Sequence, residues 1–259
     1  MQIRANRCSI QVGCRVDCPG QAGDVTPEAG AFQATREGSR RAEDFVDVDG
    51  RIGLGRFMSR SAHSSVPESI LTLTDEKSRS TTVRLFGTTA RVAYRTDEIE
   101  HARRRQAGLG HLESMELLDI LMDLPDGTGV PIASVDAVSL RLLRSAPEGV
   151  VRFAASSVTR LVRPVVTPRL AVVHAREWHD GLERASRFAA YCPRLTVVPE
   201  LPPDPEKVLA EASFYGIGVA VGARSAPTVV LEPEPFLDWQ PSVAWWHFTE
   251  QVYRHTLGH

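Results

Sequence analysis

The stretch "RLAVVHAREWHDGLERASRFAAY", residues 169–191, decides the fold of the second half of the chain. It begins with an apolar run that predicts a buried β-strand ending near His174. Apolar side chains then recur at helical spacing from Trp178 onward, which predicts an amphipathic helix. Functional side chains often lie at such strand ends, so this junction is the first candidate site. Its ionisable side chains are His174, Arg176, Glu177, His179 and Asp180.

The segments around this stretch alternate between strand and helix patterns. Residues 150–166 are β-rich and precede it. Short strands are expected after it, at 194–200, 217–223 and 227–233, and helices at 111–124, 133–146, 204–216 and 241–257. Strands and helices in this order predict an α/β or α+β protein with a mixed central sheet flanked by helices.

The first part of the chain differs in composition from the rest. Residues 1–57 are rich in Gly, Arg, Asp and Ser, and they cannot bury enough apolar surface to offset their ordering entropy. We expect a disordered extension or an over-extended gene start, because Met58 opens a sequence typical of a natural protein start. Residues 58–110 predict a small N-terminal region with a hairpin at 81–94 and a charged helix, ahead of a main domain at 111–259.

Bulk composition excludes several classes of protein. The chain has 259 residues and a formal net charge of −2, so no global field attracts it to nucleic acid. No apolar run approaches the roughly 20 residues that span a bilayer, and the N-terminus lacks a signal-peptide core. We therefore expect a cytoplasmic protein with no membrane partner. Cys8, Cys14 and Cys18 lie close together, but their spacing matches no usual zinc-binding pair, so no metal site is predicted.

A longer pattern extends the opening stretch in both directions. A strand ending in charged residues is followed by a helix with the pattern "W…GL…A…F…Y", then by "LTVVPE" and by "A…YGIGVAV". From Ser134 to Val230 this order resembles the PD-(D/E)XK superfamily, the restriction-endonuclease-like nucleases. The resemblance implies a restriction-endonuclease-like domain over residues 111–259. In that family, a strand ending in Glu-x-Lys contributes to a two-carboxylate Mg²⁺ site that cleaves phosphodiester bonds.

The sequence departs from that motif at its functional positions. His174-Ala175-Arg176 stands in place of Glu-x-Lys, residues 156–170 contain no acid, and Arg184 replaces the Gln of the following helix. Histidine binds Mg²⁺ poorly, and arginine stays protonated and cannot act as a base. The resemblance therefore implies a degenerate nuclease, or one whose carboxylates have migrated and that uses Mg²⁺ or Mn²⁺. The candidate catalytic residues are then Glu177, Asp180, Glu183 and His174, with Asp136 on the preceding helix.

Arginine supplies nearly all the basic side chains, and several lie near the strand–helix junction. If the strands and the helix pack as expected, these side chains face one groove and contact phosphates of nucleic acid. The alternative is that they are scattered surface arginines. The candidates are Arg163, Arg169, Arg176, Arg184 and Arg187. The basic run 103–105 in the charged helix could contact phosphate, but a solvated helix face is the favoured interpretation.

Two other motifs are present only in part. His174, Glu177 and His179 suggest a zinc site, but the histidines are five residues apart rather than four, as in metalloprotease helices. The two short helices and the strand within 111–166 are similar to a degraded winged helix-turn-helix, but the third, recognition helix of that motif is not visible.

These observations favour a non-catalytic regulatory or accessory protein that binds DNA or a protein partner through a degenerate nuclease-like fold. One alternative is a divergent metal-dependent DNase with migrated carboxylates. The other is a structural or assembly protein that docks, or self-associates, through its apolar C-terminal helix at 241–257. The leading hypothesis requires no cofactor.

Overall fold

The computed structural model describes residues 67, 70, 73–74, 77–236 and 240–257. These residues belong to one compact unit, Arg60–His259. The expectations for residues 1–57, including the three clustered cysteines, lie outside the described part of the chain.

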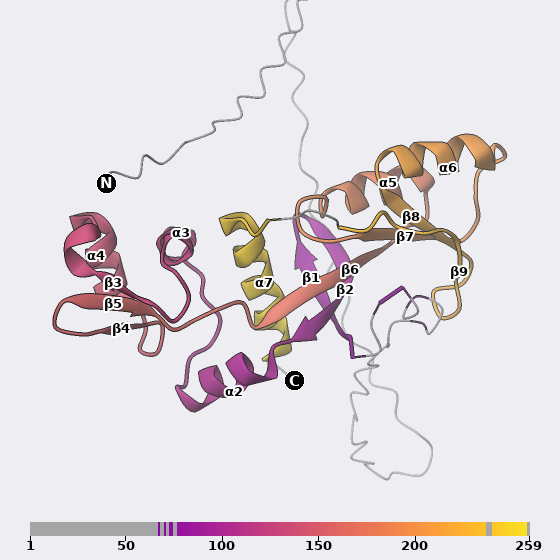
Figure 1. Ribbon diagram of the computed structural model, residues 1–259. Coiled ribbons are helices and arrows are strands. Elements are labelled where there is room, and N and C mark those ends of the chain that lie inside the picture. Colours follow the sequence, from indigo (N-terminus) through magenta and orange to yellow (C-terminus); the bar gives the residue numbers. More distant parts are fainter. Residues whose placement is uncertain (1–66, 68–69, 71–72, 75–76, 237–239, 258–259) are drawn as a thin grey trace, which may run out of the picture. The chain divides into compact units, whose positions relative to one another are not determined.

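Six strands form the central sheet, in the order β1-β2-β6-β7-β8-β9 (Figure 1). β6, β7 and β8 are parallel to one another, and the other neighbouring pairs are antiparallel, which confirms the expected mixed sheet. The strands are β1 (Arg79–Leu85), β2 (Thr88–Thr96), β6 (Val166–His174), β7 (Arg194–Val198), β8 (Ile217–Val221) and β9 (Thr228–Leu231).

The predicted hairpin is an integral part of this sheet. β1 and β2 meet at a tight turn in which Phe86 and Gly87 both have positive φ, 53° and 67°. β2 then pairs with β6 along six residue pairs, with Arg91 opposite Val172. The hairpin and the strand β6, which lie on the two sides of the expected boundary at residue 110, are therefore paired in one sheet.

Three helices cover one face of the sheet: α5 (Trp178–Ser186), α6 (Pro205–Phe214) and α7 (Val243–Thr256). α5 and α6 are the crossovers that parallel strands require. Inward-facing residues such as Leu182 and Val208 pack against Val173 and Val219 of the sheet. The opposite face carries a smaller apolar cluster that includes Ile70, Leu170, Val172 and Leu195.

α2 (Glu98–Gln106) contributes to a buried ion cluster rather than a solvated face. Arg104 is fully buried and donates from Nε to Glu100, at 2.9 Å, and from both Nη atoms to Glu250 of α7, at 2.8 Å each. Arg103 also pairs with Glu100, at 2.7 Å. We call Glu100, Arg103, Arg104 and Glu250 the buried ion cluster. The expectation of a solvated face for 103–105 is therefore wrong for its central residue.

A small unit is inserted between α2 and β6. Its three-stranded antiparallel sheet has the order β3-β5-β4. The elements are α3 (Met115–Asp123), β3 (Gly129–Pro131), the 3₁₀ turn η1 (Ile132–Ser134), α4 (Ala137–Ser145), β4 (Val151–Phe153) and β5 (Ser157–Arg160). β5 therefore does not pair with β6, whose neighbours are β2 and β7. Asp136 caps α4 and accepts from the amides of Val138 and Ser139.

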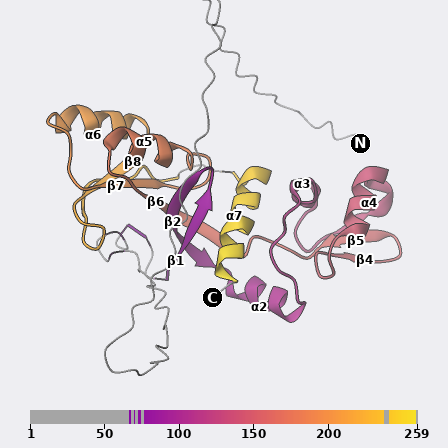
Figure 2. The same cartoon turned by 180° about the vertical axis from the view of Figure 1, so that it is seen from behind.

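α7 connects the small unit with the central sheet. Its Phe248 and Val252 lie in the core of the sheet, whereas Trp245 and Trp246 lie in the core of the small unit. Figures 1 and 2 both place α7 between the two. The large apolar side chains of this helix are thus buried within the chain, which leaves no wide apolar face for docking or self-association.

Candidate functional site

A pocket of about 310 Å³ lies at the carboxyl end of β6, where the sequence predicted the candidate site. We call it the basic pocket, because its charged side chains are three arginines, joined by one histidine. None of its described lining residues is acidic. They are Pro67, Thr82, Thr89, Ala90, Arg91, Val172, His174, Arg184 and Arg224.

Strand alternation directs two rows of side chains toward this pocket. Ala90 and Val92 of β2 face the helix-covered core, so Arg91 between them points to the other face. Register places Arg91 beside Thr82 of β1 and Val172 of β6, and all three line the pocket. The sheet thus holds the Arg91 backbone in a fixed position beneath the cavity.

His174 is the last residue of β6 and is half buried in this pocket. Among the described residues, its buried Nδ1 atom has no hydrogen-bond partner. Burial lowers the pKa of His174 below its usual value, and the positive charges of Arg224 and Arg91 lower it further. The surroundings therefore favour the neutral imidazole, whose Nδ1 has no partner among the described residues.

The three arginines differ in how well they are neutralised. Arg184 of α5 donates to Asp180, at 2.9 Å, and weakly to the His174 carbonyl, at 3.4 Å. Arg91 and Arg224 form no hydrogen bond or ion pair with any residue that the structure describes, and burial lowers the pKa of Arg91. A negatively charged ligand would supply the missing partner, because partly buried cations are stabilised by nearby anions.

The candidate catalytic carboxylates do not gather at this pocket. Glu177 is the exposed N-terminal cap residue of α5. Asp180 and Glu183 are exposed on the same helix and form ion pairs with Arg184 and Arg187, at 2.9 and 2.8 Å. Within the described residues, no three His, Cys, Asp or Glu side chains are arranged to hold a metal ion. Asp136 is likewise committed to its capping role in the small unit.

The five predicted phosphate-binding arginines do not share one groove. Only Arg184 lines the basic pocket. Arg163 pairs with Asp97 at 3.0 Å, and Arg187 donates to the Phe86 carbonyl at 2.8 Å, which ties α5 to the β1–β2 turn. Arg176 is exposed between β6 and α5, and Arg169 lines a different pocket.

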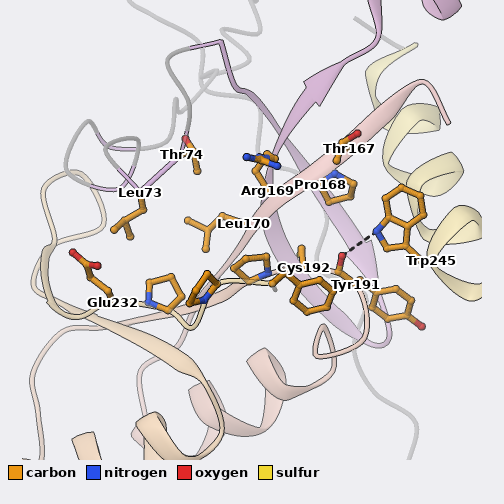
Figure 3. A pocket seen from close by; sticks show the side chains of 14 residues that line it. Leu73, Thr74, Thr167, Pro168, Arg169, Leu170, Tyr191, Cys192, Glu232 and Trp245 are labelled. Carbon is orange, nitrogen blue, oxygen red and sulfur yellow. Dashed lines mark hydrogen bonds between the residues drawn. The ribbon is translucent and has the colours of Figure 1, made fainter. Parts of the chain in front are cut away.

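That second pocket is larger, about 630 Å³, and has a different character (Figure 3). Proline and aromatic side chains form much of its wall, including Tyr191 and Trp245. The indole N–H of Trp245 donates to the backbone carbonyl of Tyr191 at 3.1 Å. Its charged side chains are one cation and one anion, Arg169 and Glu232. This balance does not favour an anionic ligand, so the basic pocket is the better candidate.

Sequence reasoning found His174 and Arg184 but missed Arg91 and Arg224. Arg91 alternates with Ala90 and Val92, which identifies its face of the strand but not its neighbours. Only the pairing of β2 with β6 brings it near His174. No local pattern marks Arg224, which lies in the loop between β8 and β9.

Comparisons with known proteins give no relative for this chain: no family model matches it, and neither the curated proteins nor the solved structures show a significant match. No helix in the described part of the chain is long and apolar enough to cross a membrane.

Proposed function

We propose that this protein is a non-catalytic accessory or regulatory protein that binds nucleic acid by holding a backbone phosphate in the basic pocket. The observation that carries this proposal is the cluster of Arg91, Arg184, Arg224 and His174 around one cavity without an acidic lining residue. Arginine guanidinium groups donate to phosphate oxygens, and so does a histidine ring nitrogen that carries a proton. A cavity of about 310 Å³ suits a phosphate with part of its sugar better than a whole oligonucleotide.

The order of elements supports a degenerate restriction-endonuclease-like origin of this pocket. β6, α5, β7, α6 and β8 follow one another as the resemblance implies, and the pocket lies where β6 ends. A strand neighbouring β6 would supply an acid in an active relative, but β2, with the sequence "TTARVAYRT", has none. Basic and hydroxyl side chains here favour binding over metal-dependent hydrolysis.

The alternative of a metal-dependent DNase requires at least two carboxylates near one metal ion. Glu177, Asp180 and Glu183 are exposed, and the latter two are paired with arginines. A nuclease assay with Mg²⁺ or Mn²⁺ tests this alternative. We expect no cleavage, whereas metal-dependent cleavage that disappears in Glu177→Ala would establish the DNase.

Binding is tested with a labelled single-stranded oligonucleotide of about 12 nucleotides, whose flexible backbone can present a phosphate to a recessed cavity. We expect its affinity to fall as salt is raised from about 50 to about 200 mM. Arg91→Ala should weaken binding about tenfold, because it removes a cation from the pocket floor. The measurement is fluorescence anisotropy of the full chain.

The matched control is Arg105→Ala, which removes an exposed arginine from α2, at the far end of β2 from the pocket. It should change the affinity by less than about twofold, because it removes only long-range charge. Equal effects of Arg91→Ala and Arg105→Ala would show that binding depends on overall charge, and the pocket proposal would fail.

A further inference from the structure

The basic pocket holds more positive charge than one internal phosphate of a nucleic acid strand can neutralise. Arg91, Arg184 and Arg224 line it. Within the described part of the chain, the one carboxylate bound to any of them is Asp180, which pairs with Arg184 at 2.9 Å. Two of the three cations are thus left without a counter-charge. An internal phosphodiester carries one negative charge, whereas a phosphate monoester carries about 1.5 to 2 at pH 7.

Acidic side chains near the pocket leave this excess in place. β1, β2 and β6 contain no acid, and neither does the β8–β9 loop that carries Arg224. Glu177 and Glu200 follow β6 and β7 along the chain, but both are exposed and neither lines the pocket. Burial lowers the pKa of His174 most, and the positive charges of Arg224 and Arg91 lower it further, while no carboxylate of the described residues opposes them. The field at this ring is therefore positive.

The three arginines come from different elements and converge on one cavity. Arg91 belongs to β2 and lies in register with the buried Val172 of β6, which also lines the pocket. Arg184 comes from α5, and Arg224 from the β8–β9 loop. A terminal phosphate offers three non-bridging oxygens to such donors, one more than an internal phosphate. It also needs room for the chain to leave on one side only, which suits a recess of about 310 Å³.

An exposed arginine beside the pocket provides a contact for the rest of the strand. Arg84 of β1 lies directly opposite Thr89 of β2, so both side chains are on the same face of the sheet. Thr89 lines the pocket, and Arg84 does not. Arg84 is two residues from Thr82, another lining residue, which places it about 7 Å further along the strand. A phosphate next to the one in the pocket can therefore reach Arg84.

We propose that the basic pocket binds the terminal phosphate monoester of a single nucleic acid strand, and that Arg84 contacts the phosphate that follows. This inference rests on the proposed function, because it specifies which phosphate the pocket prefers. Arg91 and Arg224 neutralise the two charges of the monoester, and Arg184, which is shared with Asp180, donates to its remaining oxygen. A 5′-phosphate and a 3′-phosphate have this chemistry in common, and the experiment distinguishes them.

The test measures fluorescence anisotropy of the full chain at about pH 7.5, where the monoester carries nearly two charges. The probes are single strands of about 12 nucleotides with an internal dye, which carry a 5′-phosphate, a 3′-phosphate or hydroxyl groups at both ends. We expect one of the two phosphorylated strands to bind about tenfold more tightly than the hydroxyl strand. A hydroxyl strand of about 13 nucleotides adds charge without a terminal phosphate and should gain less than about twofold.

Three substitutions assign the effect to residues. Arg224→Gln removes one cation from an exposed loop and should reduce the advantage of the terminal phosphate to about twofold or less, while the hydroxyl strand loses less than about threefold. Arg84→Gln should weaken both strands alike, about fivefold, and leave the advantage unchanged. Arg105→Gln on α2 is the matched control and should change neither affinity by more than about twofold.

Four outcomes overturn the inference: equal affinities of the phosphorylated and hydroxyl strands, an equal gain in the longer hydroxyl strand, an advantage that survives in Arg224→Gln, or an equal loss in Arg105→Gln. Adenosine 5′- and 3′-monophosphate separate a strand end from a free nucleotide. They should compete at least about fivefold less well than the unlabelled phosphorylated strand, because they cannot reach Arg84. Equal competition would overturn the preference for a strand end.

Failure of this inference differs from failure of the proposed function. If the hydroxyl and phosphorylated strands bind alike and Arg91→Ala weakens both, the pocket holds an internal phosphate, and only the preference for a strand end is wrong. If no strand binds, or if Arg91→Ala leaves all affinities unchanged, the proposed function fails as well.

Discussion

The buried ion cluster and the basic pocket use arginine in opposite ways. In the cluster, two arginines meet two carboxylates, and Arg104 bonds to both Glu100 and Glu250. Glu250 also accepts from the Trp246 indole and the Leu112 amide, at 3.0 Å each. In the basic pocket, three arginines meet one carboxylate, Asp180, which pairs only with Arg184.

The difference follows from burial. Arg104 is fully buried, so an unpaired charge there would be very unfavourable, and the fold supplies both counter-charges. Burial alone raises the pKa of Glu100, but hydrogen bonds and charge from Arg103 and Arg104 outweigh it, and the pKa lies below its usual value. The pocket arginines reach solvent and remain available to a ligand. The placement of carboxylates, rather than the number of arginines, thus distinguishes the buried ion cluster from the basic pocket.

Breaking the buried ion cluster should have the largest effect. Arg104→Met keeps much of the side-chain volume but leaves Glu100 and Glu250 buried with fewer partners. We expect a loss of about 3–5 kcal/mol in the free energy of unfolding. Chemical denaturation of the full chain, followed by tryptophan fluorescence, measures it.

The neighbouring Arg105→Met is the natural control, since Arg105 is exposed on the same helix. Its expected cost is below about 0.5 kcal/mol. Similar unfolding free energies for the two variants would mean that Arg104 does not hold α2 against α7.

A second variant should make the basic pocket resemble the buried ion cluster. Thr89→Glu adds a carboxylate to the pocket lining, near Arg91 and His174. It should occupy the arginines, weaken oligonucleotide binding about tenfold, and stabilise the fold by up to about 1 kcal/mol.

Thr89→Gln separates the effect of charge from that of shape, because glutamine has the same length as glutamate and carries no charge. It should bind the oligonucleotide nearly as well as the wild-type chain. If Thr89→Glu and Thr89→Gln bind equally, the pocket does not select anions. Anisotropy titration and denaturation of both variants provide the two measurements.

Local patterns were enough to predict much of the central fold. The apolar run before His174 and the helical spacing after Trp178 correspond to β6 and α5, and Gly216 ends α6 with the positive φ, 65°, that such a cap requires. The failures concern non-local pairing. Nothing in residues 81–94 reveals that the hairpin pairs with β6, more than 70 residues later along the chain.

The site was predicted less completely for the same reason. The sequence predicted a candidate site at the His174 junction, and the structure places His174 and Arg184 in the basic pocket there. Its assignment to carboxylates depended on Glu177, Asp180 and Glu183, which the helix turns toward solvent or toward arginines. The burial of Arg104 could not be predicted from local sequence either, because its partner Glu250 lies 146 positions away along the chain. Charge in a sequence predicts an ion pair only when the partner is within a few residues.

The smallest expected effect is the pH dependence that His174 gives to the basic pocket. Because the folded-state pKa of His174 is lowered, the folded chain binds fewer protons than the unfolded chain in acid. The contribution of His174 to stability is therefore complete above about pH 6.5 and is lost as pH falls through the lowered pKa.

A phosphate in the pocket favours the protonated imidazole, so oligonucleotide affinity should rise as pH falls below about 6.5, by at most about tenfold per pH unit for one proton. His174→Gln cannot take up that proton, and its affinity should lose this pH dependence while retaining the salt dependence that the arginines confer. A pH profile unchanged in His174→Gln would place the bound phosphate away from His174.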